Sequence, residues 1–432
     1  MTRTTLLLLM LFIGMFTIDA QSNISEKAMN MADDIESQVI DWRRHFHENP
    51  ELSNREVETG KKIADILTSM GLKVDTGIAL TGVVGVLDTG KPGATIAMRA
   101  DIDALPVIER ADLPFKSTKK TTYLGNDVGV MHACGHDTHT AMLLGTAKIL
   151  TSMKEELTGK FVFVFQPAEE GAPPGEEGGA KLMIKEGIID KYGIDVFFGQ
   201  HISSGLDAGR INYKVGGIMA ASDRFTIKVK GKQTHGSRPW GGVDPIVTSA
   251  QIIMGLQTII SRQTNLTNEA AVITVGVING GVRNNIIPEE VEMIGTVRTL
   301  DTEMQKEIHE RIIKTATSIA EAQGATAEVD IQIGYPVTYN NPELTKKMLP
   351  SLFSAAGEEN VRVTPAITGA EDFSFFAKEV PGLYFFVGGK NPNDANPYPH
   401  HTPDFLIDES GMKTGVKAMC KLAIDYMSMS AQ

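Results

Sequence analysis

Thiol, imidazole and carboxylate side chains lie close together in two short segments of the chain. Cys134 and His136 are two residues apart in MHACGHDTH, and Glu169-Glu170 follow the apolar run FVFVFQP. These are the ligand types that hold zinc-like cations in proteins. A second carboxylate beside a ligand carboxylate is what metal-assisted hydrolysis requires as its base. The pattern therefore predicts a hydrolytic metal site.

Further histidines occur in two similar settings. His201 follows the apolar segment DVFFGQ, and His400-His401 precede Thr402-Pro403 in a proline-rich segment. Taken singly, each candidate has an ordinary structural interpretation, such as a buried hydrogen-bonded histidine or a polar loop. In open α/β sheets, however, sites form at the carboxyl ends of strands, where most of these groups are expected. Together they favour a metal centre.

The candidate ligands are too many for one ion. A single catalytic zinc normally takes three protein ligands, whereas a two-metal site takes more, some of them bridging. Five are available, namely Cys134, His136, Glu170, His201 and one of the two C-terminal histidines. Cysteine and histidine favour Zn, Mn, Co or Ni over Mg or Ca. The sequence therefore predicts two divalent transition-metal ions per subunit.

The adjacent glutamates suggest a division of roles. Because successive side chains alternate along an extended segment, Glu169 and Glu170 are expected to point in different directions. One can bind metal while the other takes a proton from an activated water and later returns it to the leaving amine.

The elements that must position these groups alternate between strand-like and helix-like patterns. Apolar runs such as TGVVGVLD and TIAMRAD alternate with helical segments, which predicts a mostly parallel sheet covered on both faces. Residues 217–336 instead read β-α-β-β-α-β, the ferredoxin-like order. We therefore expect an α/β catalytic domain of residues 21–216 and 337–432, with an inserted α+β domain of residues 217–336.

The first 20 residues form a candidate secretory signal. Arg3 precedes an almost continuous apolar run over residues 5–16, and Ala20 is a small residue at a plausible cleavage point. The run is too short to span a bilayer comfortably, so a cleaved signal peptide over residues 1–20 is favoured over an uncleaved anchor. We expect a secreted or periplasmic protein without a stable membrane span after cleavage.

Length, charge and cysteine content narrow the class of protein. At 432 residues the chain is expected to form two domains. A formal net charge of -12 without a basic tract argues against a nucleic-acid partner. The chain is not a disulfide scaffold, because its only cysteines are Cys134, among the metal candidates, and Cys420, in a C-terminal apolar helix pattern.

Several blocks of the sequence resemble the M20 metallopeptidase clan, and most closely its branch of N-acyl-amino-acid, hippurate and indole-acetyl-amino-acid hydrolases. The blocks are MRADIDALP (98–106), MHACGHDTH (131–139), FQPAEEG (165–171), KGKQTHGSRPWGGVDPI (230–246), NIIP (285–288), GTVRT (295–299), TGAEDFSFF (368–376) and HTPDF (401–405). They follow the family's order from about residue 36 to the C-terminus. The resemblance implies the same two-domain fold, with the inserted domain serving as lid and dimer surface.

The resemblance also implies roles for individual residues of the metal site. The implied metal ligands are Cys134, His136, Glu170, His201 and His401. His401 is preferred to His400 because it directly precedes Thr402-Pro403. Glu169 would be the base, and Asp101 and Asp137 would orient the ligands.

Three residues of the inserted domain would contact the substrate. His235, in GKQTHGSRP, would by itself be taken for a surface-loop histidine. The resemblance implies that it donates a hydrogen bond to the substrate carbonyl oxygen in a neighbouring subunit's site, which fits a homodimer. Asn285 and Arg298 match family positions that hold the substrate carboxylate, although a turn residue and a strand-end charge are the ordinary alternatives.

The sequence thus predicts a dinuclear metal-dependent amidohydrolase that cleaves the amide bond of an N-acyl amino acid or short peptide. A metallo-dipeptidase or carboxypeptidase of the same clan is the alternative. A metal-dependent binding protein without catalysis is less favoured because Glu169 is present. A cysteine hydrolase using Cys134 and His136 is also less favoured, since no orienting Asn or Asp can be placed. Residues 173–177 and Trp240 depart from the commoner branch pattern, so the preferred acyl group stays open.

Overall fold

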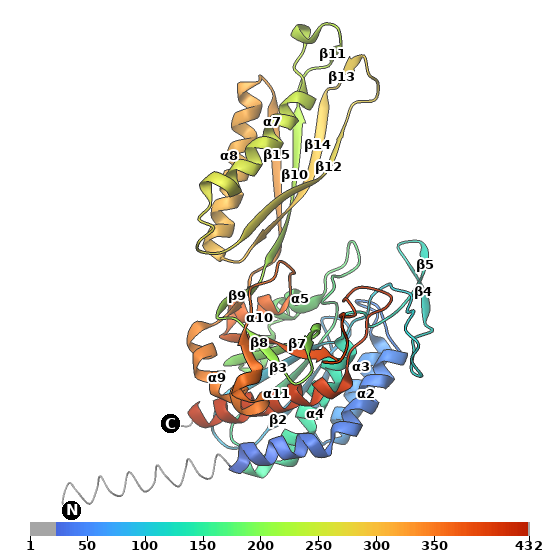
Figure 1. Ribbon diagram of the computed structural model, residues 1–432, viewed down its shortest axis with the longest axis vertical. Coiled ribbons are helices and arrows are strands. Elements are labelled where there is room, and N and C mark those ends of the chain that lie inside the picture. The colour runs from blue at the N-terminus through green and yellow to red at the C-terminus, as the bar shows by residue number, and fades with distance from the viewer. Residues whose placement is uncertain (1–22, 431–432) are drawn as a thin grey trace, which may run out of the picture. The chain divides into compact units, whose positions relative to one another are not determined.

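Contacts within the chain divide residues 23–430, which this computed structural model describes, into two compact units (Figure 1). The first unit comprises residues 23–216, 340–364 and 375–430, and the second comprises residues 217–339 and 365–374. Residues 337–339 and 365–374 therefore group with the second unit, although the sequence assigned them to the catalytic domain. The predicted signal peptide over residues 1–20 lies outside the described residues and stays a prediction.

A mixed sheet organises the first unit. In spatial order its strands are β1 (Lys73–Ile78), β2 (Gly82–Asp88), β6 (Lys160–Gln166), β3 (Thr95–Asp101), β7 (Val196–Asp207), β18 (Gly382–Lys390), β8 (Ile211–Tyr213) and β17 (Val361–Val363). The central strands β6, β3, β7 and β18 run parallel, and antiparallel pairing is confined to the flanks. The expected α/β fold with a mostly parallel sheet is confirmed.

Helices cover both faces of this sheet. They comprise residues 23–34, α2 (Glu36–Glu48), α3 (Val57–Ser69), α4 (His136–Ser152), α5 (Gly179–Lys185), α6 (Ile188–Tyr192), α9 (Pro342–Ala356), α10 (Phe373–Glu379) and α11 (Met412–Ser430), with single turns η1 (Lys154–Glu156), η4 (Glu358–Asn360) and η5 (Glu409–Gly411). On β7, Phe198 packs edge-on against Tyr426 of α11, and the next residue, Phe197, stacks on Phe376 of α10. Because successive strand side chains point to opposite faces, α10 and α11 lie on opposite sides of β7. Burial on both faces explains the apolar sequence of this strand.

The second unit has the ferredoxin-like order that the sequence predicts. Its main elements are β10 (Ala221–Lys230), α7 (Pro245–Thr258), β12 (Ala271–Gly280), β14 (Glu290–Thr299), α8 (Thr302–Ala322) and β15 (Thr326–Tyr335). The four strands form an antiparallel sheet in the order β12-β14-β10-β15. Alternate residues of β10, including Phe225 and Ile227, are buried with Leu256 of α7 and Ile312 of α8. The helices therefore cover one face of the sheet.

Short elements complete both units. They are the hairpin β4 (Lys120–Tyr123) and β5 (Asn126–Gly129), the pairs β9 (Gly216–Met219) with β16 (Thr338–Asn340) and β11 (Thr234–His235) with β13 (Ile286–Ile287), and the turns η2 (Pro239–Gly241) and η3 (Ile259–Gln263). Among residues 23–430, no helix combines the length and apolar character needed to cross a membrane.

The candidate site lies where several of these elements begin or end. Strand β3 ends at Asp101, β6 ends shortly before the two glutamates, and α4 begins at His136. His201 departs from expectation, because β7 continues past it to Asp207. The pairing of β7 with β3 stops at Gly199, whereas its pairing with β18 continues, so His201 lies in the part of β7 that only β18 supports.

Candidate metal centre

Gly135 allows Cys134 and His136 to approach the same point. Its φ of 97° lies in the left-handed region, and a Cβ built on it would lie 2.3 Å from Ile202 Cγ2. A side chain at this position would therefore be strained and would clash with β7. The reversal at Gly135 lets the thiol precede the helix whose first residue is His136.

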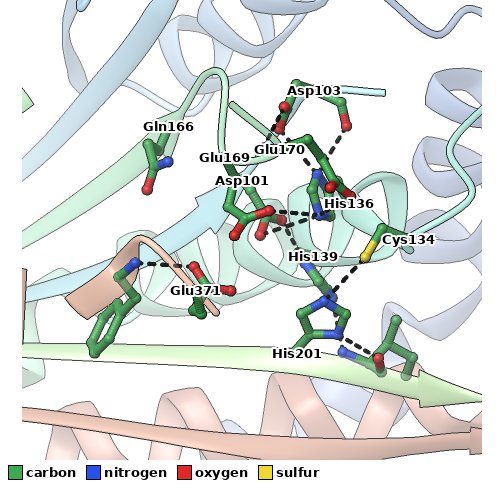
Figure 2. A network of polar contacts seen from close by, with 12 residues as sticks. Asp101, Asp103, Cys134, His136, His139, Gln166, Glu169, Glu170, His201 and Glu371 are labelled. Carbon is green, nitrogen blue, oxygen red and sulfur yellow. Dashed lines mark hydrogen bonds and ion pairs between the residues drawn. The ribbon is translucent and has the colours of Figure 1, made fainter. Parts of the chain in front are cut away.

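His136 is fixed by a carboxylate on one side and faces several on the other (Figure 2). Its Nδ1–H donates to the Asp103 carbonyl at 2.9 Å and to Asp103 Oδ1 at 3.1 Å. Its Nε2 lies 3.6 Å from Asp101 Oδ2, 3.9 Å from Glu169 Oε2 and 4.0 Å from Glu170 Oε1. Within residues 23–430, His136 Nε2 and Glu170 Oε1 are buried without a hydrogen-bond partner of acceptable geometry. A cation between them would satisfy both.

Cys134 Sγ lies between two imidazoles. Its distance is 3.4 Å to His201 Nε2 and 3.3 Å to His401 Nε2. His201 Nδ1–H donates to the Ile202 carbonyl at 2.5 Å, which leaves the Nε2 lone pair directed toward the sulfur. His401 Nε2 also lies 3.0 Å from Glu170 Oε1. The donor atoms of the five predicted ligands thus converge.

The two adjacent histidines of the C-terminal loop do different things. His400 Nδ1–H donates to the Cys134 carbonyl at 3.1 Å, and its Nε2 accepts from Ser204 N–H at 3.1 Å. Both nitrogens of the His400 ring therefore form hydrogen bonds, and these bonds fix the loop that carries His400 and His401. His401 has a φ of 61°, and its backbone N–H donates to the Ala133 carbonyl. The structure directs the ring of His401, and not that of His400, at the Cys134 thiol and the Glu170 carboxylate.

The donor set fits metal ions. Four overlapping groups within the first unit each bring their ligand atoms within 4.8 Å of one another. They are Cys134 with His136 and His201, Cys134 with Glu170 and His401, His136 with Glu169 and Glu170, and Asp101 with His136 and His139. Overlapping groups that share Cys134, His136 and Glu170 are what a pair of neighbouring ions would require.

The electrostatics of the site favour positive charge. Burial alone would lower the pKa of His136, but Asp101, Asp103 and Glu170 raise it to about 10. Burial, followed by the charges of Glu170 and Glu169, raises the pKa of Cys134 well above its usual value. Without a cation the thiol therefore stays protonated, which argues against a cysteine nucleophile. Burial together with His139 and His400 lowers the pKa of His201, so this ring stays neutral and able to bind metal.

The glutamate pair is placed differently from the sequence argument. Glu169 and Glu170 do not continue an extended segment but lie in a turn, and Ala168 before them has a φ of 53°. Strand alternation therefore does not set their directions. The left-handed Ala168 turns the chain so that Glu170 reaches His401 while Glu169 lies near His136.

Of the two acids expected to orient ligands, Asp101 contacts the site and Asp137 does not. Asp101 Oδ1 accepts from His139 Nδ1–H at 2.5 Å, and Oδ2 pairs with Arg99 at 2.8 Å. Asp137 instead lies 2.7 Å from Arg43 Nε and 2.9 Å from His47 Nδ1. Burial would raise the pKa of Asp137, but Arg43 and His47 hold it well below its usual value. Asp137 therefore anchors α4 to α2.

Sequence reasoning missed Asp103, which orients His136. The available signal was its place two residues after Asp101 in ADIDALP, since acids that follow a strand end can face the same edge of the sheet. His139 was also missed. It accepts a hydrogen bond from Ile202 N–H at 2.8 Å through Nε2, so it connects Asp101 with the strand that carries His201.

The substrate-binding candidates fall into two groups within the second unit. His235 pairs with Ile286 across β11 and β13, and Gly236 N–H donates to the Asn285 carbonyl at 2.8 Å, so exposed His235 and Asn285 are neighbours. Figure 1 shows β11 and β13 at one tip of this unit. Arg298 lies near the other end of β14, eight residues beyond Glu290. At about 3.3 Å per residue this separation is roughly 26 Å, too far for one small substrate to contact both groups in one chain.

Comparison with known proteins identifies the family. Residues 97–425 match the model of Peptidase family M20/M25/M40. The chain belongs to this family. It is 43% identical to thermostable carboxypeptidase 2 of Saccharolobus solfataricus over 94% of this chain and 99% of that protein. It is 38% identical to N-acetyl-L-cysteine deacetylase of Bacillus subtilis over 88% of this chain and 85% of that protein.

A solved structure agrees with the fold and with the kind of site. A dinuclear metal-binding M20 peptidase of Bacillus subtilis superposes with a TM-score of 0.76 and 34% identity, covering 91% of this chain and 99% of that one. Membership of the M20 family makes the chain a metal-dependent hydrolase that acts on amides. The convergence of the donor atoms described above fits this activity.

Metal affinity should rise with pH. In the metal-free protein, His136 with a pKa of about 10 and Cys134 with a raised pKa both carry a proton at neutral pH. A cation must displace these protons, so each displaced proton should raise the apparent association constant up to about tenfold per pH unit below those pKa values. Competition with a chromophoric chelator between about pH 6.5 and 8.5 would measure this. A flat affinity across that range would contradict the assigned charge state.

Proposed function

We propose that this M20 hydrolase is a dinuclear amidohydrolase that removes the acyl group from N-acyl amino acids. The observation that carries the proposal is the convergence of Cys134, His136, Glu170, His201 and His401, with Glu169 beside them. The deacetylase relative in Bacillus subtilis supports the substrate class.

The metal-binding roles follow from the donor geometry. Cys134, His136, Glu170, His201 and His401 would hold two Zn, Mn, Co or Ni ions, the choice that cysteine and histidine donors favour. Asp103 would orient His136 through its Nδ1, and Asp101 would face the Nε2 of the same ring. When bound, the ions would supply Lewis acidity for the amide carbonyl and lower the pKa of a water to about 7.

Glu169 is the proposed general base. Its carboxylate is buried and lies on the His136 side of the site, 3.9 Å from the ring Nε2. From there it would take the proton of the attacking water and then deliver it to the nitrogen of the departing amino acid. Glu170, its neighbour, would remain a ligand because it lies against His401.

Replacing Glu169 by Gln should separate binding from catalysis. The amide keeps the size of the side chain but cannot accept the proton, so kcat should fall by roughly three orders of magnitude or more. Bound metal, measured by elemental analysis, should remain at the wild-type level. Glu170→Gln is the matched control and should lose metal as well as activity. Activity of Glu169→Gln within tenfold of wild type would remove the general-base assignment.

His235 and Asn285 are proposed to act on a second subunit. Within one chain Arg298 lies roughly 26 Å along β14 from Glu290, the end of the strand that follows Asn285 and β13, so we infer that a partner chain brings His235 and Asn285 to the substrate that Arg298 binds. The proposed arrangement is a homodimer in which His235 of one chain donates to the substrate carbonyl oxygen in the other. Arg298 would hold the substrate carboxylate through its guanidinium.

Mixing two inactive variants tests the shared site. His235→Ala and Glu169→Gln should each be nearly inactive alone. In a mixed dimer, one site combines an intact Glu169 with the partner's intact His235, so full exchange should restore about a quarter of the wild-type activity. Native mass spectrometry would verify that the subunits exchanged. Verified mixed dimers without restored activity would overturn the assignment of His235 to the partner's site.

A carboxypeptidase is the second candidate function. The observation in its favour is the 43% identity to thermostable carboxypeptidase 2. Both reactions hydrolyse an amide and release an amino acid whose carboxylate is free, so the same metal site and the same Arg298 would serve either one. The two candidates differ in the group on the acyl side of the bond.

A small substrate panel distinguishes the two. We expect the metal-reconstituted protein to hydrolyse N-benzoylglycine with kcat/KM at least about tenfold above that for glycylglycine, because an acyl group lacks the charged amine of a free dipeptide. Amine release measures both reactions. A benzyloxycarbonyl dipeptide reports blocked-peptide activity. Preference for either peptide over N-benzoylglycine would favour the carboxypeptidase, and no hydrolysis by fully metal-loaded protein would favour a binding protein.

A further inference from the structure

Two buried carboxylates hold the backbone on either side of Glu169. Ala168 N–H donates to Glu56 Oε1 at 2.9 Å, and Glu170 N–H donates to Asp103 Oδ2 at 3.0 Å. Glu56 immediately precedes α3, whereas Asp103 follows β3. Segments that are distant in sequence therefore hold the backbone N–H groups of the residues immediately before and after the proposed base.

The turn requires such support. Ala168 has a φ of 53°, which lies in the left-handed region that residues with a Cβ seldom adopt. Strained backbone of this kind persists only where surrounding contacts hold it. The contact that holds the Ala168 amide is the Glu56 carboxylate.

Glu56 is itself rigidly placed. It is completely buried, and the Thr81 hydroxyl donates to its Oε2 at 2.6 Å. Burial, and next the charge of Asp103, raise the pKa of Glu56 to about 7. Burying a carboxyl group lowers the free energy of unfolding unless its hydrogen bonds compensate. Glu56 is not one of the proposed metal ligands. Its two oxygens are used to fix Thr81 and Ala168.

We propose that Glu56 is a positioning residue that acts through the Ala168 amide to aim Glu169 at the reacting water. This inference rests on the proposed function, because it assigns Glu56 a task only if Glu169 is the base. Asp103 also stabilises the turn, because it accepts the hydrogen bond from Glu170 N–H, but it orients His136 as well. Glu56 has no contact with a metal ligand side chain among the described hydrogen bonds and ion pairs, so its replacement removes support from the turn without removing a hydrogen bond of a ligand side chain.

The test compares Glu56→Ala and Glu56→Gln with Glu51→Ala. Glu51 is the matched control, because its carboxylate accepts from Thr59 N–H at 2.8 Å in the same first turn of α3 but does not touch the Glu169 turn. Each variant is loaded with metal and assayed with N-benzoylglycine as the probe. Hydrogen exchange of a peptide covering residues 161–175 reports the Ala168 amide independently of activity.

Glu56→Ala should lower kcat about 100-fold while KM changes less than about threefold, because misplacing a base by about 1 Å has an effect of that size. Its Ala168 amide should exchange faster, with metal content unchanged. Glu56→Gln should stay within about tenfold of wild-type kcat, because the amide oxygen still accepts from Ala168 N–H. Glu51→Ala should keep wild-type kcat and wild-type exchange at residue 168.

Three outcomes would overturn the proposal. They are a fully loaded Glu56→Ala within about threefold of wild-type kcat, unchanged exchange at residue 168, or an equal kcat loss in Glu51→Ala. If Glu56→Ala does not fold, Glu56→Asp takes its place, and wild-type values for kcat and exchange would then overturn the proposal. An active Glu169→Gln would instead refute the general base, and the exchange measurement would still test the grip on Ala168.

Discussion

The concentration of buried negative charge around one imidazole is the constraint on which the site depends. Asp101, Asp103 and Glu170 all act on His136, and together they raise its pKa to about 10 despite burial. Carboxylates in a low-dielectric interior are unfavourable unless positive charge or hydrogen-bond donors compensate them. A proton on His136 compensates part of this negative charge. A pair of divalent cations would compensate more of it, because the cations could also engage His136 Nε2 and Glu170 Oε1, which are buried without a hydrogen bond of acceptable geometry.

The scaffold holds these charges together through elements that are rigid for other reasons. Strand β7 is buried on both faces, and α4 begins at His136 after a glycine that no larger residue can replace without a clash. Asp137 anchors the start of α4 through Arg43 and His47 of α2. The loop that carries His401 is fixed by the two hydrogen bonds of His400 and by the contact of its own backbone with Ala133. Each ligand is thus positioned by packing or by a hydrogen bond outside the site.

The second unit presents a different kind of constraint. A ferredoxin-like unit of four strands and two helices is stable because the helices bury one face of its sheet. The tip of this unit and the far end of β14 are separated by about the length of a strand. Residues at the two ends therefore cannot contact the same small substrate within one chain. This separation favours a dimer in which the two ends come from different chains. Separating the two contacts in this way would make activity depend on assembly.

The sequence alone determined the residue types, their order and the alternation of elements. These are local properties, and they predicted the α/β fold, the ferredoxin-like insertion and four of the donor residues that the structure brings together, whereas the choice of His401 over His400 came from the family resemblance. Asp137 shows the limit of such reasoning. It lies beside His136 in sequence, yet at the start of a helix its side chain points toward α2, whereas Asp103, far away in sequence, reaches the His136 ring.

Only the tertiary structure decided the directions of side chains in the irregular segments. Periodicity predicts direction in helices and strands, but Glu169 and Glu170 lie in a turn whose left-handed Ala168 has no signature in the sequence. That conformation is held by Glu56 and Asp103, which come from other parts of the chain. Directions of this kind depend on contacts between distant segments, and those contacts exist only once the chain has folded.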